Sequence, residues 1–582
     1  MMYGRKKRCV AMFGAMALIA AGSTQAIAQE FAPNKVEIAF NRYYTHSELN
    51  DFFRKIAKAY PELVRIEKIG ESGQGRDLLV AIVTNSATGS DRDKPAMWID
   101  GNVHGNEVQA AEAVLYTLWH VTKEYGHNAK LTDLLDNTTL YLLPSQNPDG
   151  RDYWFSHPNS QHSSRQNQRP VDNDGDGLFD EDPYDDLDGD GSITQMWKRD
   201  PNGRWRRNVD DPRIFERAPA GKPGGWTNLG SEGIDNDGDG RINEDPPGGD
   251  DMNRNWPSDW QPDHIQRGAG EYPFSDPEPH AVGLFILDHP NIAAVQSFHN
   301  SGGMILRGPG ANYRSSSYPS ADARVYDEIG HIGEDILPYY RYMVIWKDLY
   351  TVHGGFVNWT AEGLGIFSFT NELWTAGKYF QRDNDSPSGQ ELMRFRDLLQ
   401  FDKDFTRYTE VEHPQYGKIL VGGLNKWSSR NTPTFMLEES SHRNFGFTMF
   451  HADQMPRLKF DRVEATKMRD GLWSVTAEVR NERLIPTRSG LAARERIGRN
   501  DLFLCEPGEG EHVVTSGLLD SWLDTTMDEV RHEPSRVQFE RGVASRGGVI
   551  VRFLVTGDAG DEVTLRYVAQ KARDVETTVT LN

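Results

Sequence analysis

The segment DGNVHGNEV, residues 100–108, places a histidine and a glutamate three positions apart, a pair that could bind a metal ion. His104 lies on the loop after the predicted strand 96–100. The apolar positions after Glu107 advance by three and four, which predicts a helix from about Glu107. A ligand on the loop and another in the first helical turn can converge on one ion at the carboxyl end of a strand. The same short motif also occurs in ordinary polar loops, so both interpretations stay open at this point.

The surrounding sequence alternates predicted strands and helices, which indicates an α/β fold. Apolar residues at helical spacing behind a Thr45 or Ser47 cap predict the first helix. Residues 77–85 and 96–100 predict buried strands, residues 138–150 contain another strand, and residues 281–303 predict a helix followed by a strand. We therefore expect a mixed, mainly parallel sheet with helices on both faces.

Five sequence blocks occur in a fixed order between about residues 40 and 380: HGNE, MNRNWP, SFHNSGG, LYTVHGGFVNWT and FSFTNELW. This ordered series resembles the zinc carboxypeptidases of the carboxypeptidase A-like (funnelin) family. Five blocks in the same order are a far more specific signal than any one of them. The resemblance implies a carboxypeptidase-like fold, one catalytic zinc ion, and hydrolysis of the C-terminal peptide bond of peptides or proteins.

The resemblance also implies which residues bind the metal ion and move the proton. A catalytic zinc ion takes three protein ligands and keeps a fourth position for water, and the family pattern assigns the ligands to His104, Glu107 and His299. Attack on a peptide also needs a general base that can later protonate the leaving amine. Glu372, which ends the predicted strand GIFSFTNE, matches the family's general base.

Further residues match the substrate-binding positions of the family. Arg254 with Asn253 matches a carboxylate clamp, because a guanidinium forms paired hydrogen bonds with a carboxylate, and Tyr350 matches a mobile phenol. The family also places an arginine directly after a tryptophan, where it holds the oxyanion. In QMWKRDPNG either Lys198 or Arg199 could serve, and we favour Arg199 because it keeps the fork geometry of a guanidinium.

Three acidic loops lie in residues 151–251, a stretch rich in Asp, Gly, Pro and Arg with little apolar periodicity. Their carboxylates alternate through glycine, and a pattern at positions 1, 3 and 5 with glycine at 6 can wrap Ca²⁺. None continues to the glutamate at position 12 of an EF-hand, and a solvated acidic linker is the alternative. We favour structural calcium because the pattern occurs three times. The candidate ligands are Asp172, Asp174, Asp176, Asp186, Asp188, Asp190, Asp235, Asp237 and Asp239.

The sequence predicts three parts. Residues 1–28 have a basic start, a short apolar run and an Ala-x-Ala site, which predict a signal peptide and export to the periplasm or the medium. Residues 29–455 form the predicted catalytic domain, including the insertion 151–251. Residues 456–582 contain short strands separated by turn residues and predict an accessory β-sandwich.

Charge and pattern also limit the partners. The formal net charge of −22 becomes −26 when the four basic signal residues are removed, which argues against nucleic acid as a partner. No later segment resembles a membrane span. Val357 stands where family members specific for basic residues carry an acid, which disfavours a preference for C-terminal Lys or Arg. The sequence does not indicate the oligomeric state.

Three other functions remain open from the sequence. The chain could be a murein stem-peptide metallopeptidase, or a zinc amidase or deacylase that uses the same metal site. It could also be an inactive, calcium-stabilised binding module. Retention of Glu372 argues against the binding module, and Arg254 with Tyr350 argues against the deacylase.

Overall fold

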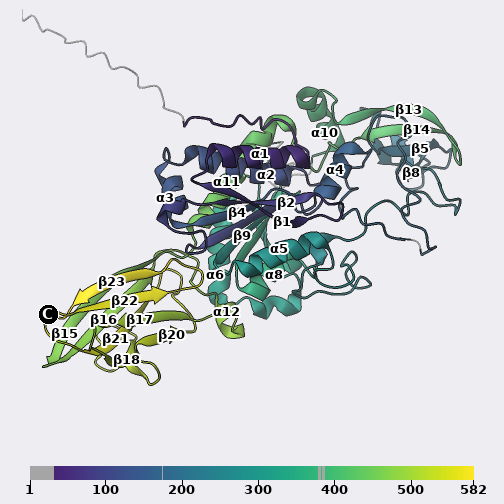
Figure 1. Cartoon of the computed structure of the whole chain (residues 1–582). Coiled ribbons are helices and arrows are strands. Elements are labelled where there is room, and N and C mark those ends of the chain that lie inside the picture. Colours follow the sequence, from purple (N-terminus) through teal and green to yellow (C-terminus); the bar gives the residue numbers. More distant parts are fainter. Residues whose placement is uncertain (1–31, 174, 376, 378–379, 381, 383–386) are drawn as a thin grey trace, which may run out of the picture.

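The computed structural model describes residues 32–173, 175–375, 377, 380, 382 and 387–582, so the predicted signal peptide lies outside the described residues. Its centre is an eight-stranded sheet with strand order β1-β2-β4-β3-β9-β12-β10-β11 (Figure 1). The strands are β1 (Val64–Glu71), β2 (Asp77–Val83), β3 (Ala96–Gly101), β4 (Thr139–Leu143), β9 (Ile292–Asn300), β10 (Met304–Arg307), β11 (Arg341–Val344) and β12 (Phe367–Leu373). Pairs β3–β4, β3–β9, β9–β12 and β10–β11 are parallel and the other three are antiparallel, which confirms the predicted mixed, mainly parallel sheet.

Helices cover both faces of this sheet, as predicted. One face packs against α1 (His46–Ala59), α2 (Gln109–Glu124), α3 (Ala129–Asn137), α6 (Ser320–Ile336) and α11 (Leu437–Asp453), and the other against α5 (Pro277–Asp288) and α8 (Phe356–Leu364). Strand β3 is buried along its whole length because Met97 and Ile99 enter one apolar core while Trp98 enters the other. The sheet edge at the end of β3 is therefore held rigidly from both sides.

The structure refines two predicted helix starts. Thr45 is the cap of α1 and forms a capping box with Glu48, so Thr45 rather than Ser47 is the cap. Helix α2 begins at Gln109 rather than near Glu107. Glu107 lies in the turn before the helix, where its N–H bonds the carbonyl of His104. Both candidate metal ligands of the opening motif are thus on the loop after β3.

A second sheet contradicts the expectation that residues 151–251 lack regular structure. Its order is β13 (Phe405–His413), β14 (Gly417–Leu424), β5 (Gln195–Arg199), β8 (Trp226–Ser231), β6 (Trp205–Arg207) and β7 (Phe215–Arg217). All its pairs are antiparallel, and Trp197 of β5 stacks on Phe215 of β7. Strands of three to six residues are too short to show periodicity in the sequence. Two of the partners also lie about 200 residues further along the chain.

The remaining helical elements are short. They are α4 (Pro148–Ser156), α7 (Ile345–Asp348), α10 (Gly389–Phe395), α12 (Gly490–Glu495), the 3₁₀ turns η1 (Ser86–Thr88), η2 (Met252–Arg254), η3 (Asn312–Ser317) and η5 (Thr434–Met436), and the π-helical turn η4 (Arg396–Gln400). No helix of the described ranges is long and apolar enough to span a bilayer.

The C-terminal part forms two antiparallel sheets, which confirms the predicted β-sandwich. The first sheet has the order β15 (Leu458–Arg469), β16 (Leu472–Asn481), β21 (Gly548–Thr556), β18 (Val513–Leu519) and β19 (Asp528–Val530). The second has the order β20 (Arg536–Phe539), β17 (Asp501–Glu506), β22 (Glu562–Val568) and β23 (Val575–Thr580). Both sheets contribute to one apolar core. In Figure 1 this part lies at the opposite end of the molecule from the β5–β14 sheet. Asp322 of α6 accepts hydrogen bonds from the N–H groups of Gly490 and Leu491, which join the sandwich to the α/β part.

Candidate active site

Three buried side chains converge beyond the carboxyl ends of β3 and β9. Glu107 lies 3.0 Å from His104 through Oε1 and 3.0 Å from His299 through Oε2, in each case to the Nδ1 atom. The two Nδ1 atoms are 3.2 Å apart. Two imidazole nitrogens and a carboxylate that face one another within 4.8 Å can hold a metal ion, and their types suit zinc with one open position.

Neighbouring groups orient the first ligand. The Nε2 atom of His104 lies 3.1 Å from Asp251 Oδ1, which assigns the ring proton to Nε2 and leaves the Nδ1 lone pair for a metal ion. Asn102, in the left-handed region at φ 58°, donates through its amide to the His104 carbonyl over 2.7 Å. Gly105 cannot be replaced without movement, because a Cβ there would lie 2.4 Å from the Ser164 carbonyl oxygen. The ligand loop is therefore fixed on three sides.

Strand register places the candidate general base beside a metal ligand. Glu372 of β12 is paired with His299 of β9 in the parallel ladder. Burial raises the pKa of Glu372 to about 7, and the Glu107 charge adds to this, while His299, Arg165 and Arg430 oppose it. A metal cation bound nearby would favour the carboxylate form further. Glu372 is thus a carboxylate whose proton affinity suits exchange of a proton with water.

The candidate carboxylate clamp lies on the other side of the metal ligands. Arg254 ends η2, is largely buried, and donates from Nη1 to the carbonyl of Asn253 over 2.8 Å. The Asn253 Oδ1 accepts the N–H of Phe356 over 2.9 Å, and the Trp256 N–H bonds the Gly354 carbonyl over 3.0 Å. These bonds join η2 to the loop before α8. Tyr350 lies on that loop and is 58% exposed, so its ring is free to move.

A family model described as zinc carboxypeptidase matches residues 49–206 and 223–393, more than half of the chain. The chain belongs to the zinc carboxypeptidase family. A second model, a domain of unknown function (DUF8731), matches residues 457–580.

Individual relatives are distant or short. The chain is 24% identical to mouse Carboxypeptidase A1 over 349 residues, which is 58% of this chain and 64% of that protein. It is 34% identical to human Carboxypeptidase D over 103 residues, which is 18% of this chain and 8% of that protein. A yeast relative named inactive metallocarboxypeptidase ECM14 is 27% identical over 146 residues, 25% of this chain and 34% of that protein. The chain thus spans less than two thirds of each of these relatives.

Two solved structures match the chain at low similarity. Carboxypeptidase A from Helicoverpa armigera gives a TM-score of 0.44 at 17% identity over 72% of this chain and 74% of that one. Thrombin activatable fibrinolysis inhibitor gives a TM-score of 0.43 at 18% identity over 72% of this chain and 76% of that one.

The structure corrects the prediction for the oxyanion cation. Lys198 and Arg199 lie in the second sheet, where Lys198 Nζ is 5.8 Å from the Tyr416 ring centre and Arg199 stacks at 4.7 Å from that of Trp226. Neither reaches the metal ligands. Arg165 does lie beside the candidate ligands, with its Nη1 3.2 Å from Glu107 Oε1 and its Nε 3.1 Å from Asp251 Oδ2. The motif of a tryptophan followed by cations was misleading here, because Trp197, Lys198 and Arg199 of β5 pack on aromatic residues of the second sheet.

Sequence reasoning missed three residues of this zinc carboxypeptidase site. Asp251 bonds both His104 and Arg165. Burial alone would raise the pKa of Asp251, but the charges of Arg165 and Arg254 and the hydrogen bond with His104 outweigh it and hold the pKa well below the usual range. A ligand histidine usually has a carboxylate partner, and Asp251 directly before MNRNW was a detectable candidate. Arg165 and Arg430 carry no such signal. They come from segments without periodicity, and only the fold brings them to Glu107.

The acidic loops share one local geometry and lie away from the metal ligands. In each, the first aspartate, Asp172, Asp186 or Asp235, accepts backbone N–H groups of the glycines that follow. Three carboxylate groups could hold a cation: Asp176 with Glu181 and Asp237, Asp186 with Asp188 and Glu232, and Asp235 with Asp237 and Asp239. Asp190 instead bonds Thr406 of β13, and Asp174 lies outside the described residues.

A buried carboxyl group near the site predicts a pH-dependent stability. Burial and the charges of Asp250 and Glu278 raise the pKa of Asp276 from 3.8 to about 8. Between about pH 4 and pH 8 the folded chain therefore holds a proton that unfolding releases, so the free energy of unfolding falls as the pH rises. Asp276→Asn stays neutral and keeps an acceptor for Asn167, which donates over 2.9 Å. We expect its Tm to fall less than that of the parent between pH 6 and pH 9.

Thermal unfolding at constant ionic strength measures this slope. Asp276 precedes helix α5, and Asp288 is the exposed last residue of that helix. Asp288→Asn is the control, because the hydrogen bond from Arg92 lowers the pKa of Asp288 and this carboxyl does not titrate between pH 6 and pH 9. Equal slopes for Asp276→Asn and the parent would contradict the prediction.

Proposed function

We propose that the chain is a zinc-dependent metallocarboxypeptidase that removes the C-terminal residue of peptides or proteins. The observation that supports this best is the arrangement around Glu107. His104 and His299 face its carboxylate, and Glu372 is paired with His299 in the sheet. The Arg254 N–H bonds the carbonyl of Asp251, whose carboxylate lies 3.1 Å from His104. A metallopeptidase needs the first four groups, and an exopeptidase needs a cation at the fifth position.

Each group has a role in the proposed reaction. Zinc bound by His104, Glu107 and His299 would supply Lewis-acid activation of water and of the scissile carbonyl. The Glu372 carboxylate accepts a proton from the attacking water and transfers it to the nitrogen of the leaving amino acid. Asp251 holds the His104 ring in the orientation that points Nδ1 at the metal position.

Arg165 is the proposed donor to the developing oxyanion. Its guanidinium is fixed by Glu107 on one side and Asp251 on the other, and its side chain is still 30% exposed. Burial lowers the pKa of Arg165, but the carboxylates of Asp251, Glu107 and Glu372 outweigh this effect and raise it, so Arg165 stays a cation. A preorganised cation beside the metal ligands stabilises negative charge where it develops.

Arg254 is the proposed clamp for the substrate carboxylate, with Asn253 and Tyr350 beside it. Paired charge-assisted hydrogen bonds are worth about 1.5–3 kcal/mol each. Arg254→Gln is therefore expected to lower kcat/KM on free-ended peptides by at least about tenfold. The measurement is release of the C-terminal amino acid from peptides with free and with amidated ends.

The same panel tests the proposed function. The wild-type chain with zinc should cut free-ended peptides by one residue and leave amidated peptides intact. Equal cleavage of both kinds would remove the clamp role of Arg254 and favour the amidase or deacylase function. Cleavage confined to murein stem peptides would favour the murein peptidase. Zinc binding without any cleavage would place the chain with inactive relatives.

We also propose that calcium stabilises the acidic insertion. The first and third loops interlock, because Asp182 accepts the N–H of Asn236 over 3.1 Å and Asp245 accepts the N–H of Asn173 over 3.1 Å. This brings Glu181 of one loop beside Asp237 of the other. Repulsion between such carboxylates is relieved by a divalent cation with oxygen ligands. Calcium would then order the sheet that carries β5 and β8.

Added calcium is expected to raise the Tm of zinc-loaded protein that has been dialysed free of calcium. At a free calcium concentration of about 100 times Kd, one site contributes about 2.7 kcal/mol. Asp235→Asn should reduce the increase in Tm, whereas Asp470→Asn, in an exposed turn, should not. An unchanged Tm in the wild-type chain would leave the loops as solvated acidic segments.

We further propose export to the periplasm or the medium, based on residues 1–28. Secretion from a bacterial host, followed by N-terminal sequencing, should give a chain that begins at Gln29. A retained N-terminus would contradict this.

A further inference from the structure

We infer that Arg430 and the pocket beside it bind substrate residues upstream of the scissile bond, so that the enzyme prefers extended peptides to dipeptides and N-acylated amino acids. The inference rests on the proposed function and adds the substrate class. Arg430 lies beyond residue 393, where the zinc carboxypeptidase match ends, so it belongs to a part of this chain that the family model does not cover.

Three arginines form a row along the metal ligands. Asp251 connects Arg254 and Arg165, because its carbonyl accepts the Arg254 N–H over 2.7 Å and its Oδ2 lies 3.1 Å from Arg165 Nε. Glu107 Oε1 lies between Arg165 at 3.2 Å and Arg430 at 3.1 Å. If the terminal carboxylate is on Arg254 and the scissile carbonyl near Arg165, the next residue of an extended substrate lies near Arg430. The row thus follows the direction of the peptide chain.

Arg430 is anchored and still has a donor to offer. Its Nη1 donates to Glu107 Oε1 and, over 2.8 Å, to the carbonyl of Asn300. These two hydrogen bonds use both protons of Nη1. Its Nη2 lies 3.1 Å from His162 Nδ1, near the surface. Among the described residues, the second Nη2 proton has no partner. A fixed guanidinium with one available N–H at the cleft is suited to bind a backbone carbonyl.

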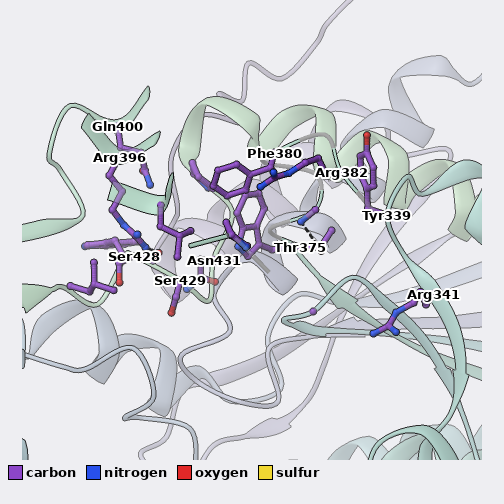
Figure 2. Close-up of a pocket in the computed structure, with 18 residues that line it drawn as sticks. Tyr339, Arg341, Thr375, Phe380, Arg382, Arg396, Gln400, Ser428, Ser429 and Asn431 are labelled. Atoms are coloured by element: carbon purple, nitrogen blue, oxygen red, sulfur yellow. Dashed lines mark hydrogen bonds between the residues drawn. The ribbon is translucent and has the colours of Figure 1, made fainter. Parts of the chain in front are cut away.

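A large pocket begins directly beside Arg430. It has a volume of about 700 Å³, and its lining includes Ser429 and Asn431 (Figure 2), which flank Arg430 in the chain. Gly302 and Trp374 also line it and follow Asn300 and Glu372 by two residues in the chain. Further out, its described lining includes Trp427 and Arg341. Indole faces bind apolar side chains, and serine and asparagine side chains bind backbone amides. This combination suits an extended peptide of mixed side chains.

One wall of the pocket comes from segments outside the family match. Residues 424–433 form one wall, and Arg396 holds this wall by donating to the Ser428 carbonyl over 2.8 Å and to Asp404 Oδ2 over 2.7 Å. Asn431 donates to the carbonyl of Asn106 over 3.1 Å, directly before Glu107. The wall is thus bonded to the ligand loop itself.

A peptide-length series tests the inference. Peptides of two to six residues with one common C-terminal residue are compared in the wild-type chain, Arg430→Gln and Arg407→Gln. Arg407 is an exposed arginine of β13 and serves as the matched control. We expect kcat/KM of the wild type to rise at least about tenfold between two and four residues, and Arg430→Gln to lose most of this rise. Arg407→Gln should keep it.

Two further readouts separate binding from metal effects. Zinc per chain should be equal in the three proteins. In the Glu372→Gln background, calorimetric Kd values of uncut peptides should decrease with length, and Arg430→Gln should weaken the longer peptides.

Each outcome is decisive. A wild-type kcat/KM that does not depend on length overturns the inference and leaves the carboxypeptidase function standing. An equal loss at all lengths in Arg430→Gln, with loss of zinc, would mean that Arg430 acts only through Glu107. If no peptide is cut, the proposed function fails, and a Kd independent of length would then overturn the inference as well.

Discussion

Glu372→Gln is expected to lower kcat for release of C-terminal amino acids by about 10²–10⁴-fold, with zinc still bound. The amide keeps the size and the hydrogen-bonding reach of the side chain but cannot take a proton from water. Because Glu372 is not a metal ligand in the geometry around Glu107, the zinc content should stay at the wild-type level. The measurements are steady-state kinetics on free-ended peptides and zinc per chain.

Glu278→Gln is the matched control for this experiment. Glu278 is also buried, and burial raises its pKa to about 7, as for Glu372, but it bonds the N–H of Gly73 rather than facing the metal ligands. It should keep wild-type kcat. Comparable activity in Glu372→Gln and the wild type would exclude Glu372 as the base.

Arg165→Gln is expected to lower kcat/KM by about 10²–10³-fold, the usual loss when one oxyanion donor is removed. Arg199→Gln and Lys198→Gln should have effects within about threefold, because their side chains pack on Trp226 and Tyr416 in the second sheet. The sequence favoured Arg199 for this role, so the two sets of variants separate the structural assignment from the one based on the motif. Steady-state kinetics on a single free-ended peptide is sufficient.

Zinc content must be measured in each of these variants, because Arg165 also bonds Glu107 and Asp251. A loss of activity in Arg165→Gln that is fully restored by excess zinc would mean that Arg165 only supports the metal ligands. A large loss of kcat/KM in Arg199→Gln with normal zinc content would show that the second sheet moves to the metal ligands when substrate binds.

Much of the fold could be predicted from the sequence. Strand β2, most of β3 and the first half of β9 are apolar runs because helices cover both faces of the sheet, and such runs are visible without a structure. The β-sandwich was visible for a related reason, since alternation of apolar residues marks strands with one buried face. The second sheet was not, because its short strands pair across about 200 residues of sequence.

The sequence by itself determined the residues whose role depends on local order. His104 and Glu107 share one loop, and Glu372 and His299 each stand at the end of a strand. The ordered blocks that resemble the zinc carboxypeptidases were therefore enough to propose them. The tertiary structure alone decided which cations reach Glu107. Arg165 and Arg430 lie 58 and 323 residues from Glu107 in the chain, and nothing in their neighbourhoods marks them. The interaction between two charges depends on their distance in space. That distance is set by how the whole chain packs, so a short sequence motif does not reveal it.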